Sequence, residues 1–316
     1  MVAFGIGPLP GTDFAQAADI VMGETGDCPH VPQLPARGLG FDAVGRTAAL
    51  LSALGPESGI SLDRGPRSWV LRQRPQLLTR RTQDGVERDL DMLQEVWGED
   101  VPVLKTQVLG PWSLAAAVEL DNGHRVLTDV GAVADLHAIL REAITAHKRD
   151  LARRFRTGAD KILVQLDEPL LPAVLAGKVP GTTDFDPIRA VPEEVALARL
   201  QEFDADFVHA APLWGLGAAA ETWLCDFQGL DAPRHLDGLG EHLEGGRRVG
   251  LGLDPAGGDA RQAAIAVARH WNRMQIPQEL LSTQVDVYPA RVRDAHQDYA
   301  FAAEVARILS RDAGDL

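Results

Sequence analysis

The sequence predicts an α/β protein, folded over residues 1–316 as a single (β/α)8 TIM barrel. Eight short, compact apolar runs recur along the chain, as expected for parallel strands that are buried on both faces. Amphipathic segments separate many of these runs, and 316 residues fit one barrel. The alternative, an open doubly wound sheet, is disfavoured because no Gly-x-Gly-x-x-Gly follows the first run.

The strands are predicted from these apolar runs, which end in glycine, proline or polar residues. The stretch 17–66 after the first run is rich in proline and glycine at 23–40, and it is predicted to be a long excursion from the barrel. The eight predicted strands are 2–7, 68–73, 103–110, 161–169, 206–212, 222–228, 248–255 and 280–288.

Helices are predicted from apolar periodicity and from end signals. Segment 133–155 has apolar residues at i, i+3 and i+4 spacing, 192–203 begins with proline and two glutamates, and 235–246 ends on glycines. The other predicted helices are 82–98, 259–274 and 296–312.

Composition excludes several classes of partner. The net charge of −14 disfavours nucleic acid, because phosphate binding needs clustered Lys and Arg. No uninterrupted apolar run reaches about 18 residues, so a membrane span is not expected. The first residues do not read as a signal peptide, and two cysteines require no disulfide framework. We therefore expect a cytoplasmic protein with a small-molecule substrate, of a size that leaves the oligomeric state open.

Candidate site residues follow from the rule that catalytic groups of barrels lie at the carboxyl ends of strands. An aspartate and a glutamate at one such end, Asp167 and Glu168, favour function over simple turn capping. His209 alone would be read as a core histidine, and Asp254 as a turn residue that bonds a loop amide. The polar residues at the predicted strand ends are Gln107, Asp167, Glu168, His209, Asp226, Asp254 and Asp286.

Several motifs in order resemble the catalytic barrel of cobalamin-independent methionine synthase, and more closely the short single-barrel proteins similar to it. They are GIGPLPGTD at 5–13, PHVPQLPARG at 29–38, GPWSLA at 110–115, VQLDEPLLPAVLAG at 164–177, VH at 208–209 and GLGLDP at 250–255. The resemblance implies a barrel of the methionine-synthase and uroporphyrinogen-decarboxylase type. It also implies a methyltransferase of methionine biosynthesis, which moves a methyl group from a 5-methyl-folate to the thiol of homocysteine.

The resemblance also assigns roles to residues. Asp167 would contact the substrate amine, and Asp167 and His209 are the predicted catalytic residues. Pro8 stands where the family usually has a serine that holds the amino acid, which removes a hydroxyl and a backbone donor. Trp112 could stack on a flat ring beside the folate loop. The predicted substrate-binding residues are Gly5, Ile6, Gly7, Asp167, Glu168, Gly110, Pro111 and Trp112.

The family's zinc site is the main departure. Zinc lowers the pKa of the substrate thiol and is held by a His-x-Cys pair, a glutamate and a second cysteine. His209 matches the histidine, Ala211 stands at the first cysteine, Asp226 is the nearest match to the glutamate, and Val285 is the best match to the last cysteine. Two ligands do not make a zinc site. The sequence predicts a degenerate site with His209 and Asp226 as remnants.

Three functions follow from these observations. The first is a methionine-synthase-like protein whose zinc-dependent activity is in question. The second is a non-catalytic paralogue that binds a folate or an amino acid as a sensor or partner. The third is altered chemistry, in which His209, Asp226 and Asp286 hold a metal harder than zinc.

Overall fold

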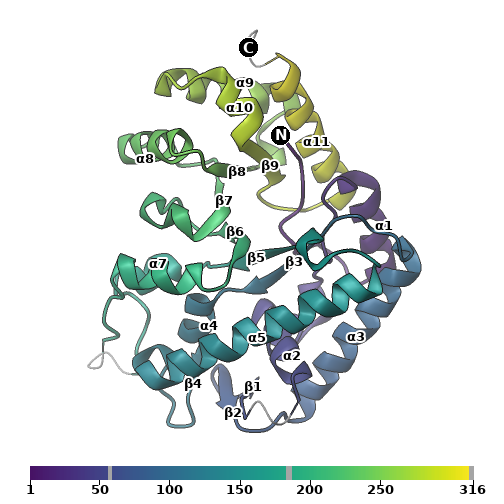
Figure 1. Ribbon diagram of the computed structural model, residues 1–316, viewed down its shortest axis with the longest axis vertical. Coiled ribbons are helices and arrows are strands. Elements are labelled where there is room, and N and C mark those ends of the chain that lie inside the picture. Colours follow the sequence, from purple (N-terminus) through teal and green to yellow (C-terminus); the bar gives the residue numbers. More distant parts are fainter. Residues whose placement is uncertain (56–58, 183–186, 313–316) are drawn as a thin grey trace.

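The main sheet has six parallel strands in the order β3-β5-β6-β7-β8-β9. The computed structural model describes residues 1–55, 59–182 and 187–312. Figure 1 shows the strands stacked in a curl, with α7, α8 and α9 along one side. The six strands are β3 (Leu104–Leu109), β5 (Ile162–Asp167), β6 (Ala205–His209), β7 (Ala220–Asp226), β8 (Arg248–Leu253) and β9 (Val285–Pro289).

Two extended segments continue the pairing beyond the edge strands. The first segment, at 3–8, lies beside β9 through a bridge of Ala3 with Val287. The second segment, at 29–33, lies beside β3 through a bridge of His30 with Lys105. The segments also meet each other, since Leu9 N donates to Gln33 O at 2.8 Å and Gln33 N donates to Gly7 O at 3.0 Å. Backbone pairing therefore runs around the curled sheet.

The prediction of eight regular barrel strands is confirmed for six runs only. Run 2–7 makes isolated bridges instead of a strand, because its glycines and Pro8 interrupt regular pairing. The prediction that run 68–73 is a strand of the barrel is wrong. Its strand β2 (Trp69–Arg72) pairs antiparallel with β1 (Ser61–Arg64) and parallel with β4 (Val118–Glu119) in a separate small sheet.

Helices occupy all six predicted segments, with shifts at their ends. Residues 17–66 also contain most of α1, all of α2 and strand β1, and the beginning of run 280–288 is helical. The helices are α1 (Phe14–Thr25), α2 (Ala43–Ala53), α3 (Leu77–Trp97), α4 (Pro111–Ala117), α5 (Val130–Arg154), α6 (Leu171–Leu175), α7 (Glu193–Gln201), α8 (Pro233–Glu244), α9 (Ala260–Met274), α10 (Gln278–Gln284) and α11 (Ala295–Asp312). None of those described is long and apolar enough to span a bilayer.

Aspartates define where four helices begin. Asp13, Asp42, Asp129 and Asp259 precede α1, α2, α5 and α9, and each side chain accepts a hydrogen bond from a backbone N–H of the first turn. These bonds satisfy donors that the helix itself leaves free, and the carboxylate is favoured by the helix dipole. The helix starts are thus fixed locally by sequence.

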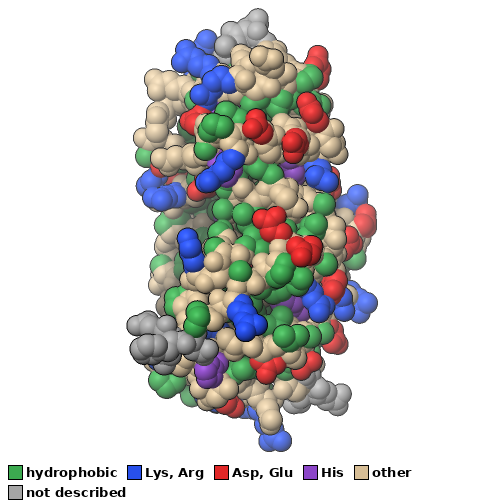
Figure 2. Space-filling model, turned by 90° about the vertical axis from the view of Figure 1, so that its left-hand side faces the viewer, with side chains coloured by type: hydrophobic (Ala, Val, Ile, Leu, Met, Phe, Trp, Pro, Cys, Tyr) green, Lys and Arg blue, Asp and Glu red, His purple; other side chains and the backbone are tan. Residues whose placement is uncertain are grey.

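Hydrophobic packing separates the molecule into an outer layer and a small centre. The large cluster lies between the sheet and its helices and includes Val208, Trp223 and Cys225. The centre of the curled sheet holds a separate cluster of Phe4, Cys28, Phe207, Leu224 and Tyr288. Figure 2 shows acidic and basic side chains interspersed over the face on the side of α7, α8 and α9, not gathered by sign.

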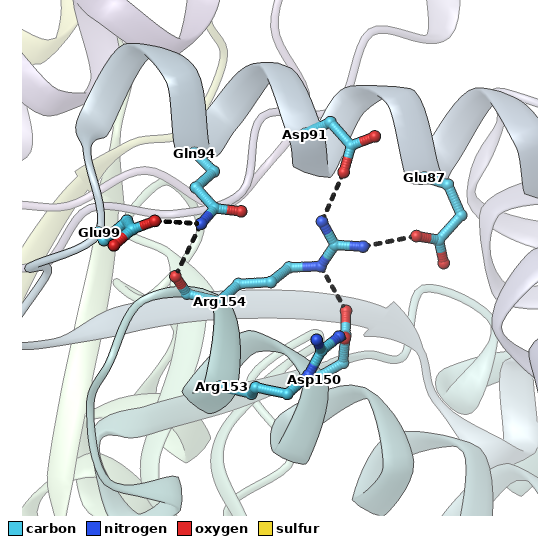
Figure 3. Close-up of polar contacts among 7 residues, drawn as sticks. All are labelled: Glu87, Asp91, Gln94, Glu99, Asp150, Arg153 and Arg154. Carbon is cyan, nitrogen blue, oxygen red and sulfur yellow. Dashed lines mark hydrogen bonds and ion pairs between the residues drawn. The ribbon is translucent and has the colours of Figure 1, made fainter.

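Arg154 joins the carboxyl end of α5 to α3 (Figure 3). Its guanidinium donates to Asp150, Asp91 and Glu87, each at 2.6 Å, and its backbone carbonyl accepts from Gln94 at 3.2 Å. Burial alone would raise the pKa of Asp150, but bonds from Arg154 and Arg153 outweigh it and hold that pKa below its usual range. The guanidinium of Arg154 thus pairs with three carboxylates, one on α5 and two on α3.

We expect Arg154→Met to lower the free energy of unfolding by about 1–2 kcal/mol, because the network is only partly desolvated and its loss leaves three carboxylates without their shared cation. Arg153→Met is the matched control, since Arg153 is 75% exposed and its ion pair is with Asp150. Urea unfolding at low and high salt measures both. Equal destabilisation by the two variants would contradict the role assigned to Arg154.

Candidate functional site

Asp167 and His209 lie together at the carboxyl ends of neighbouring strands. They are register partners at the last paired position of β5 and β6. His209 Nδ1 lies 3.2 Å from Asp167 Oδ1, and the side chains are 28% and 16% exposed, respectively. The expectation that these two side chains share one end of the sheet is confirmed. Both side chains are thus partly exposed at this end of the sheet.

Hydrogen bonds fix the orientation of the Asp167 and His209 side chains. Gln165 lies two residues before Asp167 and therefore on the same side of β5, and its Nε2 donates to Asp167 Oδ1 at 2.7 Å. A carboxylate oxygen only accepts, so the hydrogen between the pair belongs to His209 Nδ1, and in the neutral ring Nε2 is then an acceptor. Both bonds converge on Oδ1, so neither of them engages Oδ2.

Glu168 is turned away from this pair and holds the beginning of α4. Its Oε1 accepts from Trp112 N at 2.9 Å, and its Oε2 accepts from Ser113 N at 2.7 Å and from Ser113 Oγ at 2.6 Å. A Cβ at Gly110 would lie 2.5 Å from Oε1, so only glycine leaves room there. Both carboxylate oxygens, predicted to contact substrate, are engaged by the Gly-Pro-Trp-Ser turn.

Trp112 packs behind the turn. Its indole nitrogen donates to Ala196 O at 3.2 Å, and its ring meets His137 edge-on at a centroid distance of 5.1 Å. The ring also borders a groove formed with Val130, Ile188 and Val195. Pro111 is buried beside it at the first position of α4, where proline suits a helix start.

The segment Gly5, Ile6 and Gly7 lies against the interior of the sheet. A Cβ at Gly5 would lie 2.3 Å from His30 Cε1, and one at Gly7, whose φ is +118°, would lie 2.5 Å from Gln107 Nε2. Ile6 O accepts from Gln165 Nε2 at 3.0 Å. The glycines therefore let this backbone approach the buried side chains of His30 and Gln107.

The remaining aspartates do not all lie at the same end of the sheet. Asp226 is exposed at the carboxyl end of β7, and Asp254 Oδ1 accepts from Ala256 N at 3.0 Å, which confirms its turn role. Asp286 lies near the amino end of β9, where it pairs with Arg248 at 2.6 Å and accepts from Val2 N at 2.7 Å. The grouping of Asp286 with His209 and Asp226 as metal ligands is therefore wrong.

The donors present do not fit the implied zinc. Val285 is the first residue of β9, so its match to a ligand at the opposite end of the strand is also wrong. Cys225 packs in the outer cluster, away from His209, and burial raises the pKa of its thiol. Across residues 1–55, 59–182 and 187–312, no three His, Cys, Asp or Glu side chains are grouped to hold a metal.

Tyr288 is a site residue that the sequence reasoning missed. Its ring meets His209 edge-on with centroids 5.8 Å apart, and its buried hydroxyl has no hydrogen-bond partner within the described ranges. Asp286 was selected from the motif VDVYPA, although Tyr288 lies on the same side of β9 and nearer its carboxyl end. Counting two residues along the strand would have found it.

Comparisons with known proteins find likeness of structure but not of sequence. No family model and no curated protein matches the sequence. A B12-independent methionine synthase from Shewanella sp. W3-18-1, solved in complex with selenomethionine, is 13% identical, with a TM-score of 0.45; the alignment covers 79% of this chain and 72% of that one. At this level the likeness carries no conclusion about activity.

Glu168 generates a prediction about pH. Burial raises its pKa from 4.5 to about 7 against the opposing bonds from Ser113 and Trp112. Because folding favours the protonated form, this contribution to stability is complete below about pH 4.5 and is lost as pH rises through about 7. We expect the difference in free energy of unfolding, wild type minus Glu168→Gln, to fall by about 2 kcal/mol between pH 5 and pH 8.

Denaturant unfolding of both proteins at the two pH values measures this difference. Glu193→Gln is the control, because Glu193 is exposed at the beginning of α7. A difference that is constant or grows with pH would show that Glu168 is ionised throughout.

Proposed function

We propose that this chain is a methionine-synthase-like protein that binds a small molecule carrying a cationic amine, such as a free amino acid, and does not catalyse zinc-dependent methylation of homocysteine. The observation that carries the first part is the arrangement of Asp167. Its Oδ1 is held by Gln165 and His209, and neither bond engages its Oδ2. An ammonium group would form charge-assisted hydrogen bonds with that oxygen.

Neighbouring groups support recognition of an amino acid over a bare amine. His209 Nε2 can accept a hydrogen bond, and the buried hydroxyl of Tyr288, unpartnered in the described part of the chain, can donate one to a ligand oxygen. Buried polar groups normally have partners, so a ligand group is a reasonable occupant of that position.

The second part rests on the donors at the zinc positions. A free thiol with a pKa near 8.5 is only a few per cent ionised at pH 7, so thiol methylation needs an activating metal. Ala211 offers no ligand where the family needs cysteine, and Asp286 is at the other end of its strand. Altered metal chemistry with His209, Asp226 and Asp286 is therefore not proposed.

Binding through Asp167 gives the direct test. We expect methionine or homocysteine to bind, and Asp167→Asn to weaken the affinity about tenfold or more, because the substitution removes the charge that pairs with the ammonium group. Isothermal titration calorimetry measures it. Asp254→Asn is the control, since Asp254 bonds Arg293 and a loop amide away from the pair. Unchanged affinity in Asp167→Asn would refute amine recognition.

Catalysis gives a second test. We expect no methionine formation from homocysteine with mono- or polyglutamyl 5-methyl-folates, with or without added zinc. Ala211→Cys should increase zinc binding because it adds a thiol next to the strand that ends in His209, whereas Val285→Cys, at the opposite end of the sheet, should not. Turnover that a chelator abolishes in the wild type would contradict the proposal.

A further inference from the structure

Lys105 is a fully buried cation in the centre of the curled sheet. It is the second residue of β3, and its Nζ lies 4.9 Å from the ring centroid of Phe4 and 5.4 Å from that of Phe207. Burial lowers its pKa to about 8, opposed by the nearby Cys28 and Asp167. Because that value is above 7, the protonated form predominates at neutral pH.

The hydrogen bonds around Gln165 connect this cation to the candidate site. Lys105 Nζ only donates, so the amide oxygen of Gln165 must face it, which turns the amide nitrogen to the other side. That nitrogen donates to Ile6 O at 3.0 Å and to Asp167 Oδ1 at 2.7 Å. Both amide hydrogens are therefore used, and the direction of the whole row is fixed from Lys105 to Asp167.

We propose that Lys105 is a positioning residue, which sets the orientation of the Gln165 amide and thereby presents Asp167 Oδ2 to the ligand. The proposal rests on the proposed function, in which Asp167 binds the amine. A charged donor at one end of a hydrogen-bonded row polarises the amide and strengthens its bond to the carboxylate at the other end. This effect is larger in the interior of a protein than in water.

Loss of Lys105 would leave the amide oxygen of Gln165 without the donor that faces it. The amide nitrogen would keep Ile6 O and Asp167 Oδ1 as acceptors, but the amide would no longer be anchored and polarised at its oxygen, and its bond to the carboxylate would weaken. If Lys105 served only the stability of the fold, a variant that folds without it would bind the ligand as tightly as the wild type does.

Two variants separate these roles. Lys105→Met removes the cation and keeps an unbranched side chain of similar length. Gln165→Glu keeps an acceptor for Lys105, so the lysine stays satisfied, but it removes the donor to Asp167 and to Ile6. Lys161→Met is the matched control, because Lys161 is 55% exposed and pairs with Asp160.

The experiment is calorimetry with methionine, together with 1H–15N NMR of the Gln165 side-chain amide, assigned by its absence in Gln165→Glu. We expect both interior variants to weaken methionine binding about tenfold, the value of one charge-assisted hydrogen bond, and the control to bind as the wild type does. The Gln165 NH2 signals should shift on methionine binding in the wild type, and in Lys105→Met they should be displaced and insensitive to methionine.

Each outcome decides the proposal. Wild-type affinity with unchanged Gln165 signals in Lys105→Met would overturn it, and so would wild-type affinity in Gln165→Glu if Lys105→Met does not fold. If the wild type binds neither methionine nor homocysteine, the proposed function fails. The positioning role is then judged in the ligand-free protein: displaced Gln165 signals in Lys105→Met support it, and unchanged signals overturn it.

Discussion

A buried lysine at the centre of a curled parallel sheet must have hydrogen-bond acceptors, because a charged group without them is costly in the interior. Lys105 meets this requirement with Gln165 and with two aromatic rings. Because the amide oxygen of Gln165 faces Lys105, its nitrogen faces Asp167 and donates to Oδ1, and the same oxygen accepts from His209 Nδ1. The geometry of the candidate site follows from satisfying one interior cation.

Strand alternation gives the two acidic neighbours at the end of β5 different surroundings. Asp167 continues the inward row of the strand and is partly exposed at its end, whereas Glu168 is fully buried below the beginning of α4. Three donors from Trp112 and Ser113 surround Glu168, so the turn that follows β3 is tied to β5. In the proposed function Asp167 binds the ligand, whereas Glu168 holds the turn at the beginning of α4.

The arrangement of charge also separates binding from stability. Arg154 and its carboxylates hold α5 to α3 on the outside of the molecule, where partial exposure makes each pair individually weak. The polar row inside the sheet begins at Lys105 and Gln165, which are fully buried, and hydrogen bonds between buried groups are stronger for that reason. Substitutions in the two regions should therefore affect different properties.

The sequence by itself determined six strands of the main sheet, the longer helices α5, α7, α8 and α9 between them, and the placement of Asp167 and His209 at strand ends, because apolar patterns and strand ends are local properties. The tertiary structure alone decided which sheet β2 joins, that Asp286 and Val285 lie at the wrong end for a metal site, and that Tyr288 faces His209. It also decided the pairing of Lys105 with Gln165, which are 60 residues apart. Register between distant segments is set by packing, which no local pattern encodes.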